Sequence, residues 1–205
     1  MLFIQHELQR AAQNLIADNI NAGEHVLIVS SSDQSKELID AIVSAASASI
    51  AETVSAIIIA TPFSLKDYEH PPAVIAAAES ADLTIVATTL WFPRAYDDLS
   101  KALFKAGKRQ VLINNAPLED FSRGASLAAP KELHRRTHNL ATSISNAKSV
   151  RVTSKSGTNL KVGVCRPCIA LTGKAEEDTG FGSFPSGEAM LCPEEGTAEG
   201  VFIAD

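Results

Sequence analysis

Four short apolar runs, separated by segments whose apolar residues have helical spacing, constrain the fold of this chain most strongly. The runs are Val26–Val29, Val54–Ala60, Leu83–Ala87 and Val111–Ile113. Continuous apolar runs of this kind are typical of strands in a parallel sheet that is covered on both faces. Strands that alternate with helices in units of about 30 residues predict parallel pairing through crossover connections. The sequence therefore predicts an α/β fold: a Rossmann-like parallel sheet with helices on both faces.

The segments between the runs carry apolar residues three or four positions apart, as amphipathic helices do. Ser30–Asp33 contains a candidate N-cap for the second helix. Pro71 and Pro72 open the third helix, because proline is tolerated in a first turn, and Gly107 ends the fourth. Helices are expected over residues 3–19, 38–50, 73–80, 93–106 and 130–147.

The pattern changes after Ala147, where alternating side chains replace the continuous apolar runs. Val150–Ser154 and Leu160–Val164 flank a loop that contains glycine, and two such runs predict a β-hairpin. Short strands and loops follow, up to the apolar run Val201–Ile203. We therefore expect two domains, a Rossmann-like α/β domain over residues 1–147 and an incomplete β-rich domain over residues 148–205. The last strand would need a further pairing partner.

Composition and charge exclude several classes of function. The formal net charge is −6, and the most basic cluster, Lys105–Arg109, indicates a solvated helix end, so we expect no nucleic-acid partner. No apolar run approaches the ~20 residues of a membrane span, and the N-terminus becomes polar too soon for a signal peptide. The sequence also contains neither glycine-rich motif of the common nucleotide-binding sites. A cytoplasmic protein without a membrane partner is expected.

Three cysteines indicate reduced thiols, because they are too few for a disulfide framework. Cys165 and Cys168 have the C-x-x-C spacing. Together with Cys192 they would supply three of the four ligands of a structural zinc site. A thioredoxin-like pair would lie at the start of a helix, whereas these cysteines follow a β-rich stretch. The alternative is that Cys165 and Cys168 are ordinary small buried residues.

Polar residues after two predicted strands are candidates for a ligand site. Ser30–Asp33 follows the first strand, at the carboxyl end where open α/β sheets bind ligands. Thr88, Thr89, Trp91 and Arg94 follow the third strand and are able to line the same crevice. The alternative is that Trp91 packs at the edge of the sheet.

His134 and His138 lie one helical turn apart, with the spacing of the H-E-x-x-H zinc motif. Arg135 occupies the position of the general-base glutamate in that motif. Two arginines beside a dication are also unfavourable electrostatically. We therefore expect exposed helix residues here rather than a metal site.

The stretch Gly180–Gly200, rich in glycine, proline and glutamate, contains the candidate metal ligand Glu188. Apolar residues flank it, with Phe184 and Pro185 before it and Ala189–Leu191 after it. A partly desolvated carboxylate needs a proton, a cationic side chain or a metal ion as its partner. The alternative is a loop carboxylate that accepts hydrogen bonds from nearby backbone N–H groups.

The segment Phe184–Glu188, followed by Pro193–Gly200 and an apolar run that ends at Asp205, resembles the aminopeptidase T-type leucyl aminopeptidases. In that family the glutamate of the Pro-x-Gly-Glu segment is a ligand of a two-metal centre. The resemblance implies Glu188 as a metal ligand, zinc or cobalt as the metal, a peptide as the substrate and a homodimer as the assembly. Because divalent ions lower the pKa of bound water, the implied reaction is hydrolytic removal of N-terminal residues.

A sister group, the iron-dependent dihydroxypyridine ring-cleaving dioxygenases, shares the Pro-Ser-Gly and Ala-Glu-Gly pieces but lacks a glutamate at the position of Glu188. A relative with a single ferrous ion is therefore the first alternative, and a non-catalytic α/β ligand-binding module is the second. In the peptidase family most metal ligands, including the histidines, lie downstream, whereas all five histidines here precede Glu188. We expect the first half of such an enzyme, inactive by itself and without a tightly held divalent ion.

Overall fold

The computed structural model of the protein describes all residues except 1, 62–67, 91–96, 115–116, 177–178 and 205. Cα packing groups the chain into two compact units. The first consists of residues 1–130 together with 173–186, and the second of residues 131–172 together with 187–205.

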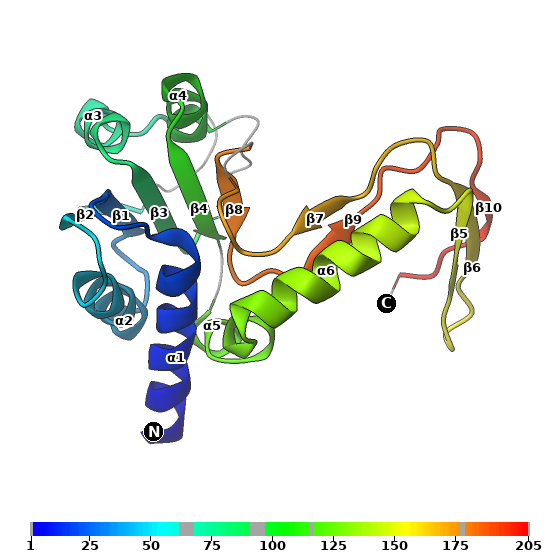
Figure 1. The fold of residues 1–205 in the computed structure, drawn as a ribbon, viewed down its shortest axis with the longest axis horizontal. Coiled ribbons are helices and arrows are strands. Elements are labelled where there is room, and N and C mark those ends of the chain that lie inside the picture. The colour runs from blue at the N-terminus through cyan, green and yellow to red at the C-terminus, as the bar shows by residue number, and fades with distance from the viewer. Residues whose placement is uncertain (1, 62–67, 91–96, 115–116, 177–178, 205) are drawn as a thin grey trace. The chain divides into compact units, whose positions relative to one another are not determined.

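The first unit is an α/β sandwich in which helices and strands alternate along the chain (Figure 1). Its sheet, within the described residues, has five parallel strands in the order β2-β1-β3-β4-β8. The strands are β1 (His25–Ser31), β2 (Thr53–Ile59), β3 (Leu83–Thr88), β4 (Arg109–Asn114) and β8 (Phe181–Ser183). The helices are α1 (Leu2–Asn19), α2 (Lys36–Ser47), α3 (Pro72–Ser80), α4 (Asp98–Ala106) and α5 (Leu118–Phe121), followed by the 3₁₀ helix η1 (Gly124–Leu127).

Alternate residues of the central strands face the two helical layers, because successive side chains of a strand point to opposite faces. Val26 and Ile28 of β1 pack in the core that contains buried residues of α1, α2 and α5. Leu27 and Val29 of the same strand pack in the core that contains buried residues of α3 and α4. The predicted Rossmann-like parallel sheet with helices on both faces is confirmed.

Two predicted helix starts were wrong. Ser35 caps α2, with its hydroxyl accepting from Leu38 N, so the cap does not lie within Ser30–Asp33. Asp97 caps α4 by accepting from Ser100 N at 2.8 Å, so this helix begins at Asp98 rather than at residue 93. Residues 93–96 are outside the described part of the chain. In both cases a side chain closer to the helix supplies the acceptor for the orphan N–H groups.

Strand β8 joins the sheet from far along the chain, which the sequence did not predict. It pairs in parallel with β4, with Gly182 opposite Val111. Asn19 holds the segment just before it, because its side chain accepts from Ala175 N at 2.8 Å and donates to Gly173 O at 3.2 Å. As a result, residues 173–186 pack with the first unit, whereas most of the sixth helix packs with the second. These units do not coincide with the ranges 1–147 and 148–205, which stay a prediction as domains.

The second unit combines α6 (Pro130–Ser145) with small antiparallel pairings (Figure 1). Its strands are β5 (Ser149–Thr153), β6 (Asn159–Gly163), β7 (Ile169–Leu171), β9 (Glu188–Met190) and β10 (Glu199–Val201). The predicted hairpin is confirmed as β5 and β6, which pair along their whole length. The final strand β10 pairs with β6, and β7 pairs with β9.

None of the helices in the described residues has the length and apolar character that crossing a bilayer requires. The β2 strand is an edge strand, and Ile58 in it is 57% exposed, so it is not covered on both faces. A continuous apolar run therefore indicates a strand covered on both faces for the inner strands, but not for β2.

Candidate functional site

The carboxyl ends of β1, β2 and β3 carry hydroxyl groups around one carboxylate, that of Asp33. Thr61 Oγ1 donates to Asp33 Oδ1 at 2.5 Å, and Thr89 Oγ1 lies 2.8 Å from both oxygens. Ser32 Oγ accepts from Thr61 N at 3.2 Å, and Ser31 Oγ accepts from Thr89 N at 3.1 Å. Each threonine is therefore held to β1 by its backbone and gives its hydroxyl to Asp33.

This group lies at the switch point of the sheet, since β1 has β2 on one side and β3 on the other. Open α/β sheets bind ligands at such a point. The expected proximity of Ser30–Asp33 and Thr89 is confirmed, whereas Trp91 and Arg94 are outside the described residues. The hydrogen bond from Thr61, with a further one from Thr89, holds the pKa of Asp33 below its ordinary value. Asp33 is thus a stable anion that ties three strand ends together.

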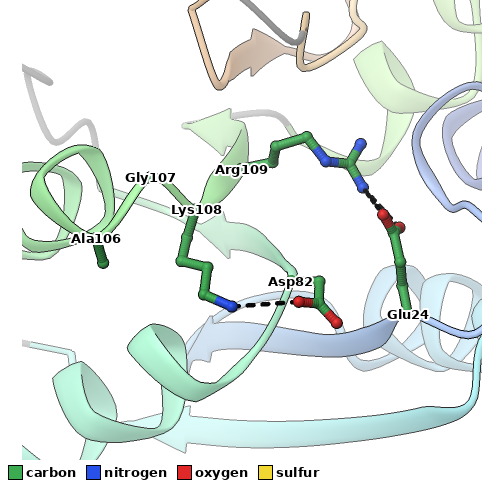
Figure 2. Close-up of a pocket in the computed structure, with 6 residues that line it drawn as sticks. All are labelled: Glu24, Asp82, Ala106, Gly107, Lys108 and Arg109. Carbon is green, nitrogen blue, oxygen red and sulfur yellow. Dashed lines mark hydrogen bonds and ion pairs between the residues drawn. The ribbon is translucent and has the colours of Figure 1, made fainter.

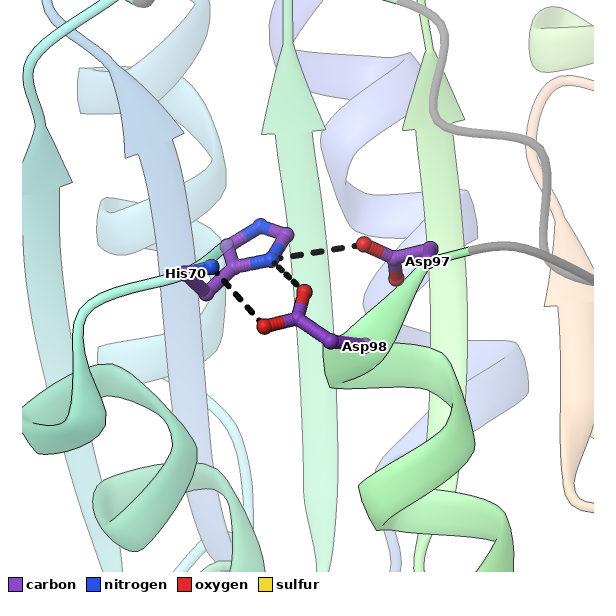
Figure 3. A group of neighbouring side chains, drawn as sticks. All are labelled: His70, Asp97 and Asp98. Carbon is purple, nitrogen blue, oxygen red and sulfur yellow. Dashed lines mark hydrogen bonds and ion pairs between the residues drawn. The ribbon is translucent and has the colours of Figure 1, made fainter. Parts of the chain in front are cut away.

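A second polar group joins the loop before α3 to the start of α4 (Figure 3). His70 Nδ1 lies 2.6 Å from Asp98 Oδ1 and 3.3 Å from Asp97 Oδ1. The backbone N–H of His70 donates to Asp98 Oδ2 at 2.9 Å. The side chains of His70 and Asp97 are almost fully buried, and that of Asp98 is 37% exposed. The imidazole therefore faces two carboxylates inside the protein.

Each member of this group has a further structural role. Burial raises the pKa of Asp98, but the side-chain and backbone hydrogen bonds from His70 outweigh it and hold the pKa below its usual range. Asp97 Oδ2 accepts from both the N–H and the hydroxyl of Ser100, at 2.8 and 2.7 Å. Tyr68 packs edge-on against the imidazole, and burial is the main cause of its raised pKa.

One imidazole nitrogen and two carboxylate oxygens form a donor set that suits several divalent transition metals. Among the described residues, His70, Asp97 and Asp98 are the three ligating side chains that come together in this way. Two ligands of a tetrahedral ion would lie about 3.3 Å apart. The 2.6 Å between Nδ1 and Asp98 Oδ1 is instead a hydrogen-bond length with a proton between the atoms. The group fits a buried histidine–carboxylate pair, and an ion would fit only after Asp98 moved outward.

Sequence reasoning did not single out His70, Asp97 and Asp98 as a group. The available signal was their position, since His70 and Asp97 precede, and Asp98 begins, helices that follow the two strands next to β1. Aspartate is also a preferred helix N-cap. The pairing itself joins residues 28 positions apart, which local patterns do not reveal.

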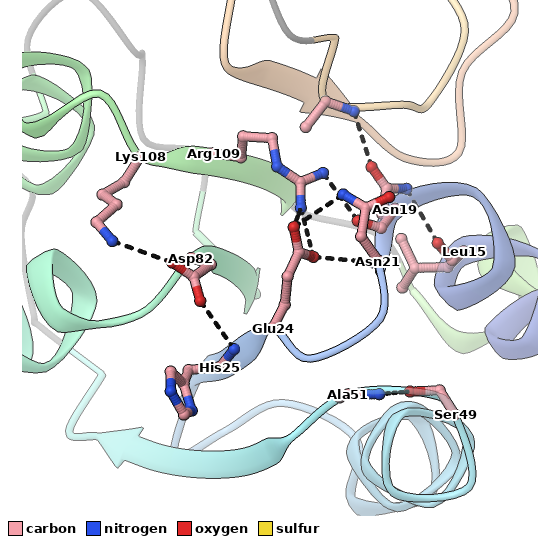
Figure 4. A network of polar contacts seen from close by, with 11 residues as sticks. Leu15, Asn19, Asn21, Glu24, His25, Ser49, Ala51, Asp82, Lys108 and Arg109 are labelled. Carbon is pink, nitrogen blue, oxygen red and sulfur yellow. Dashed lines mark hydrogen bonds and ion pairs between the residues drawn. The ribbon is translucent and has the colours of Figure 1, made fainter.

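A groove of about 590 Å³ lies at the opposite edge, at the amino ends of β1, β3 and β4 (Figure 2). Arg109 donates to both carboxylate oxygens of Glu24 at 2.6 Å, and Lys108 Nζ donates to Asp82 at 3.2 Å. Arg109 also donates to the backbone oxygen of Asn19 at 2.9 Å (Figure 4). The expectation of a solvated helix end at Lys105–Arg109 was thus wrong for Arg109, which belongs to β4. Because these ion pairs already satisfy one another, they indicate a structural network rather than a ligand site.

Glu188, the predicted metal ligand, is exposed at the start of β9, opposite Leu171. The expected desolvation by its neighbours does not occur, because Ala189 points to the other face of the strand and is half-buried. A single exposed carboxylate does not by itself fit a metal centre. The ligating group found among the described residues does not include Glu188. Its role as a ligand stays a prediction.

The other candidates lie on the second unit. His134 is half-buried and His138 is exposed on α6, and Arg135 pairs with Glu132 at 2.8 Å. The expectation of exposed helix residues is confirmed for Arg135 and His138, whereas His134 is only partly exposed. Cys168 is buried, but Cys165 is exposed, so the alternative of two buried cysteines was wrong for Cys165.

The fold has a counterpart among solved structures. The structure is similar to that of wild-type AmpT from Thermus thermophilus, with a TM-score of 0.56 and 12% sequence identity. The similarity covers 95% of this chain and 63% of AmpT, so the chain spans less than two thirds of that protein. At this identity the likeness shows a common fold. None of the curated proteins matches the sequence.

A family model provides the sequence relationship. The model is that of NicX, described as 2,5-dihydroxypyridine 5,6-dioxygenase, and it matches residues 7–205. The match therefore includes the parallel sheet, both polar groups at its carboxyl edge, and the segment around Glu188. The dihydroxypyridine dioxygenases, which were the sister group in the sequence resemblance, are thus the family that matches over almost the whole length. The chain belongs to the NicX family.

Proposed function

We propose that the gene product containing residues 1–205 is a metal-dependent dioxygenase that opens the ring of a dihydroxylated pyridine. The observation that carries the proposal is the family match over residues 7–205, whose description names 2,5-dihydroxypyridine as the substrate and the 5,6 bond as the point of cleavage. The aminopeptidase preferred from the sequence becomes the second candidate.

A ferrous ion, when bound, would supply the reaction with dioxygen activation, as non-haem iron does in oxygenases of this type. Glu188 alone does not form a centre for this ion, and His70, Asp97 and Asp98 fit a hydrogen-bonded group. The Asp33 group would have a supporting role, since it links residues at the carboxyl ends of three strands.

The second candidate is a metallo-aminopeptidase that uses zinc or cobalt. Two observations favour it: the Pro185–Glu188 segment has the glutamate that the peptidases share, and the fold is that of AmpT. In this candidate Glu188 is a metal ligand, the substrate is a peptide and the protein is a homodimer. A cytoplasmic location belongs to both candidates.

Parallel assays separate the two candidates. The gene product that contains residues 1–205 is purified without metal and loaded with ferrous iron under argon, or with zinc or cobalt. Loss of 2,5-dihydroxypyridine absorbance after addition of oxygen is measured, and so is release of p-nitroaniline from leucine p-nitroanilide. The proposal predicts iron- and oxygen-dependent loss of the pyridine and no peptidase activity. Zinc- or cobalt-dependent cleavage of the anilide without pyridine turnover would establish the second candidate instead.

The variant Glu188→Gln sharpens this test, with Glu199→Gln as its matched control. Both glutamates are exposed at the starts of short strands in the second unit. If Glu188 binds a catalytic metal, the first variant loses more zinc-dependent activity than the roughly 10–100-fold that loss of an outer-shell partner costs, and the control does not. A ring-cleaving enzyme whose relatives lack this glutamate keeps its activity in both variants.

A further inference from the structure

Two cysteines of the second unit directly adjoin an antiparallel bridge between two segments of the chain. Val164 and Pro193 form an isolated antiparallel bridge. Cys165 follows Val164, and Cys192 precedes Pro193. Because the partners in an antiparallel pairing advance in opposite directions along the chain, Cys165 and Cys192 are the residues that an extension of this bridge by one step would place opposite each other.

The pairing is held on both sides of these cysteines. On one side Glu194 N donates to Gly163 O at 3.0 Å. On the other side Ile169 of β7 pairs with Met190 of β9, and these strands lie side by side in Figure 1. Opposed residues of an antiparallel ladder have Cα atoms about 4.5–5.5 Å apart, and their side chains point to the same face. This spacing lies inside the range of about 4.4–6.8 Å that a disulfide requires.

The third cysteine is not available to this pair. Between the two pairings, one segment contains residues 165–168 and the other contains residues 191–192. The longer segment must therefore bulge, and Cys168 is at its end. Cys168 is buried, and its N–H donates to Ser145 Oγ of α6 at 2.8 Å, whereas Cys165 and Cys192 are exposed. The accessible pair is thus the one across the strands and not the C-x-x-C pair that the sequence suggests.

We propose that Cys165 and Cys192 form a modification site that a hydroperoxide oxidises to an intramolecular disulfide. The thiolate of one cysteine attacks the O–O bond of hydrogen peroxide, becomes a sulfenic acid and releases hydroxide, which takes up the thiol proton as water. The second thiol then attacks that sulfur, and the S–O bond breaks as the S–S bond forms and a second water leaves. Two thiols are oxidised by two electrons, and one peroxide is reduced to two waters. A small thiol reverses the step by exchange.

The disulfide would close a loop of the chain that contains residues 173–186, which belong to the first unit and include β8. The chain leaves the second unit after Thr172 and returns to it at Gly187, and both points lie within the loop from Cys165 to Cys192. Closing a loop of about 28 residues restricts the unfolded chain. The oxidised protein should therefore melt roughly 7–14 °C higher than the reduced protein. This inference does not depend on the proposed enzymatic function.

Peptide mapping of the oxidised protein tests the proposal. The reduced protein is treated with one equivalent of hydrogen peroxide, alkylated and digested without reductant. The expected product is a peptide in which Cys165 is linked to Cys192, with Cys168 recovered as the alkylated thiol and the link removed by dithiothreitol. A Cys165–Cys168 link, a link between two chains, or sulfinic acid without any link would overturn the proposal.

Serine variants provide the matched controls, and circular dichroism checks that they fold. Cys165→Ser and Cys192→Ser should each abolish the link and the rise in melting temperature. Cys168→Ser should leave both intact. A link that persists in Cys192→Ser, or that is lost in Cys168→Ser, would contradict the assignment. The map of the unsubstituted protein decides the question even if a variant does not fold.

Discussion

Both carboxylate oxygens of Asp33 lie 2.8 Å from the hydroxyl oxygen of Thr89, so an acidic residue after β1 is bound to the residue that follows β3. Thr61, after β2, binds the same carboxylate at 2.5 Å. One anion therefore fixes the ends of three neighbouring strands at the edge of the sheet where ligands bind in folds of this type.

Replacement of Asp33 by asparagine should reduce stability in a pH-dependent way. The folded-state pKa of Asp33 is lowered, so its contribution is complete above the unfolded pKa of about 4 and is lost as pH falls through the folded value. We expect Asp33→Asn to lower the free energy of unfolding by about 1 kcal/mol at pH 7. The difference from the original protein should shrink between pH 5 and pH 3 in urea titrations. Glu79→Gln, at an exposed position of α3, is the control, and an equal pH dependence in both variants would contradict the account.

Loss of the His70 side chain should destabilise the first unit. In His70→Ala, the buried carboxylate of Asp97 and the partly buried one of Asp98 lose the imidazole that faces them. We expect a loss of about 2–4 kcal/mol in the free energy of unfolding, measured by urea denaturation. His138→Ala, on an exposed face of α6, should change it by less than about 0.5 kcal/mol. Similar effects of the two substitutions would show that the buried group contributes little.

The predicted strands have a local sequence pattern, whereas the unpredicted strand β8 depends on a pairing with a distant part of the chain. Val26–Val29 and Leu83–Ala87 are apolar because both faces are covered, and this information is local. β8 consists of Phe-Gly-Ser, too short for any periodicity, and its partner β4 lies about 70 residues earlier in the chain. Glycine in such a strand usually marks the close approach of another backbone.

The candidate site shows the same limit. The position of Ser30–Asp33 at the end of an expected inner strand was enough to predict a polar group there. The partner Thr61 and the pairing of His70 with Asp98 depend on which loops meet across the sheet. The apolar neighbours of Glu188 suggested desolvation, but in β9 Ala189 points to the opposite face and Glu188 itself is exposed.

A methyl group at Gly182 should be poorly tolerated. A Cβ there would lie 2.6 Å from Lys174 C and 2.7 Å from Ala175 N, and both are backbone atoms that cannot rotate away. We expect Gly182→Ala to cost about 2–3 kcal/mol, measured by thermal and urea unfolding, because β8 must shift from β4.

Gly187→Ala is the matched control for that substitution. Its Cβ would lie 2.8 Å from Leu133 Cδ1, the end of a flexible side chain that can move. Its effect should therefore be smaller by at least about 1 kcal/mol. Equal costs at the two glycines would show that the backbone approach beside β8 is not what excludes a side chain.

Asn19 should not tolerate replacement by aspartate. Its buried amide donates to Leu15 O and Gly173 O and accepts from Ala175 N. In Asn19→Asp a carboxylate oxygen would face two carbonyl oxygens without a proton, at a cost of about 3 kcal/mol or more at pH 7. Asn139→Asp on the exposed face of α6 should change stability by less than about 0.5 kcal/mol. Chemical denaturation of both variants checks this, and a mild effect of Asn19→Asp would show that residues 173–175 are held by other contacts.

Isotope labelling tests the proposed dioxygenase most directly. The iron-loaded protein is supplied with 2,5-dihydroxypyridine and ¹⁸O₂ in unlabelled water, and the mass of the ring-opened product is measured. Membership in the NicX family leads us to predict a product that carries two ¹⁸O atoms. Recovery of unchanged pyridine, together with zinc-dependent incorporation of ¹⁸O into a cleaved peptide in a parallel reaction in H₂¹⁸O, would contradict the proposal.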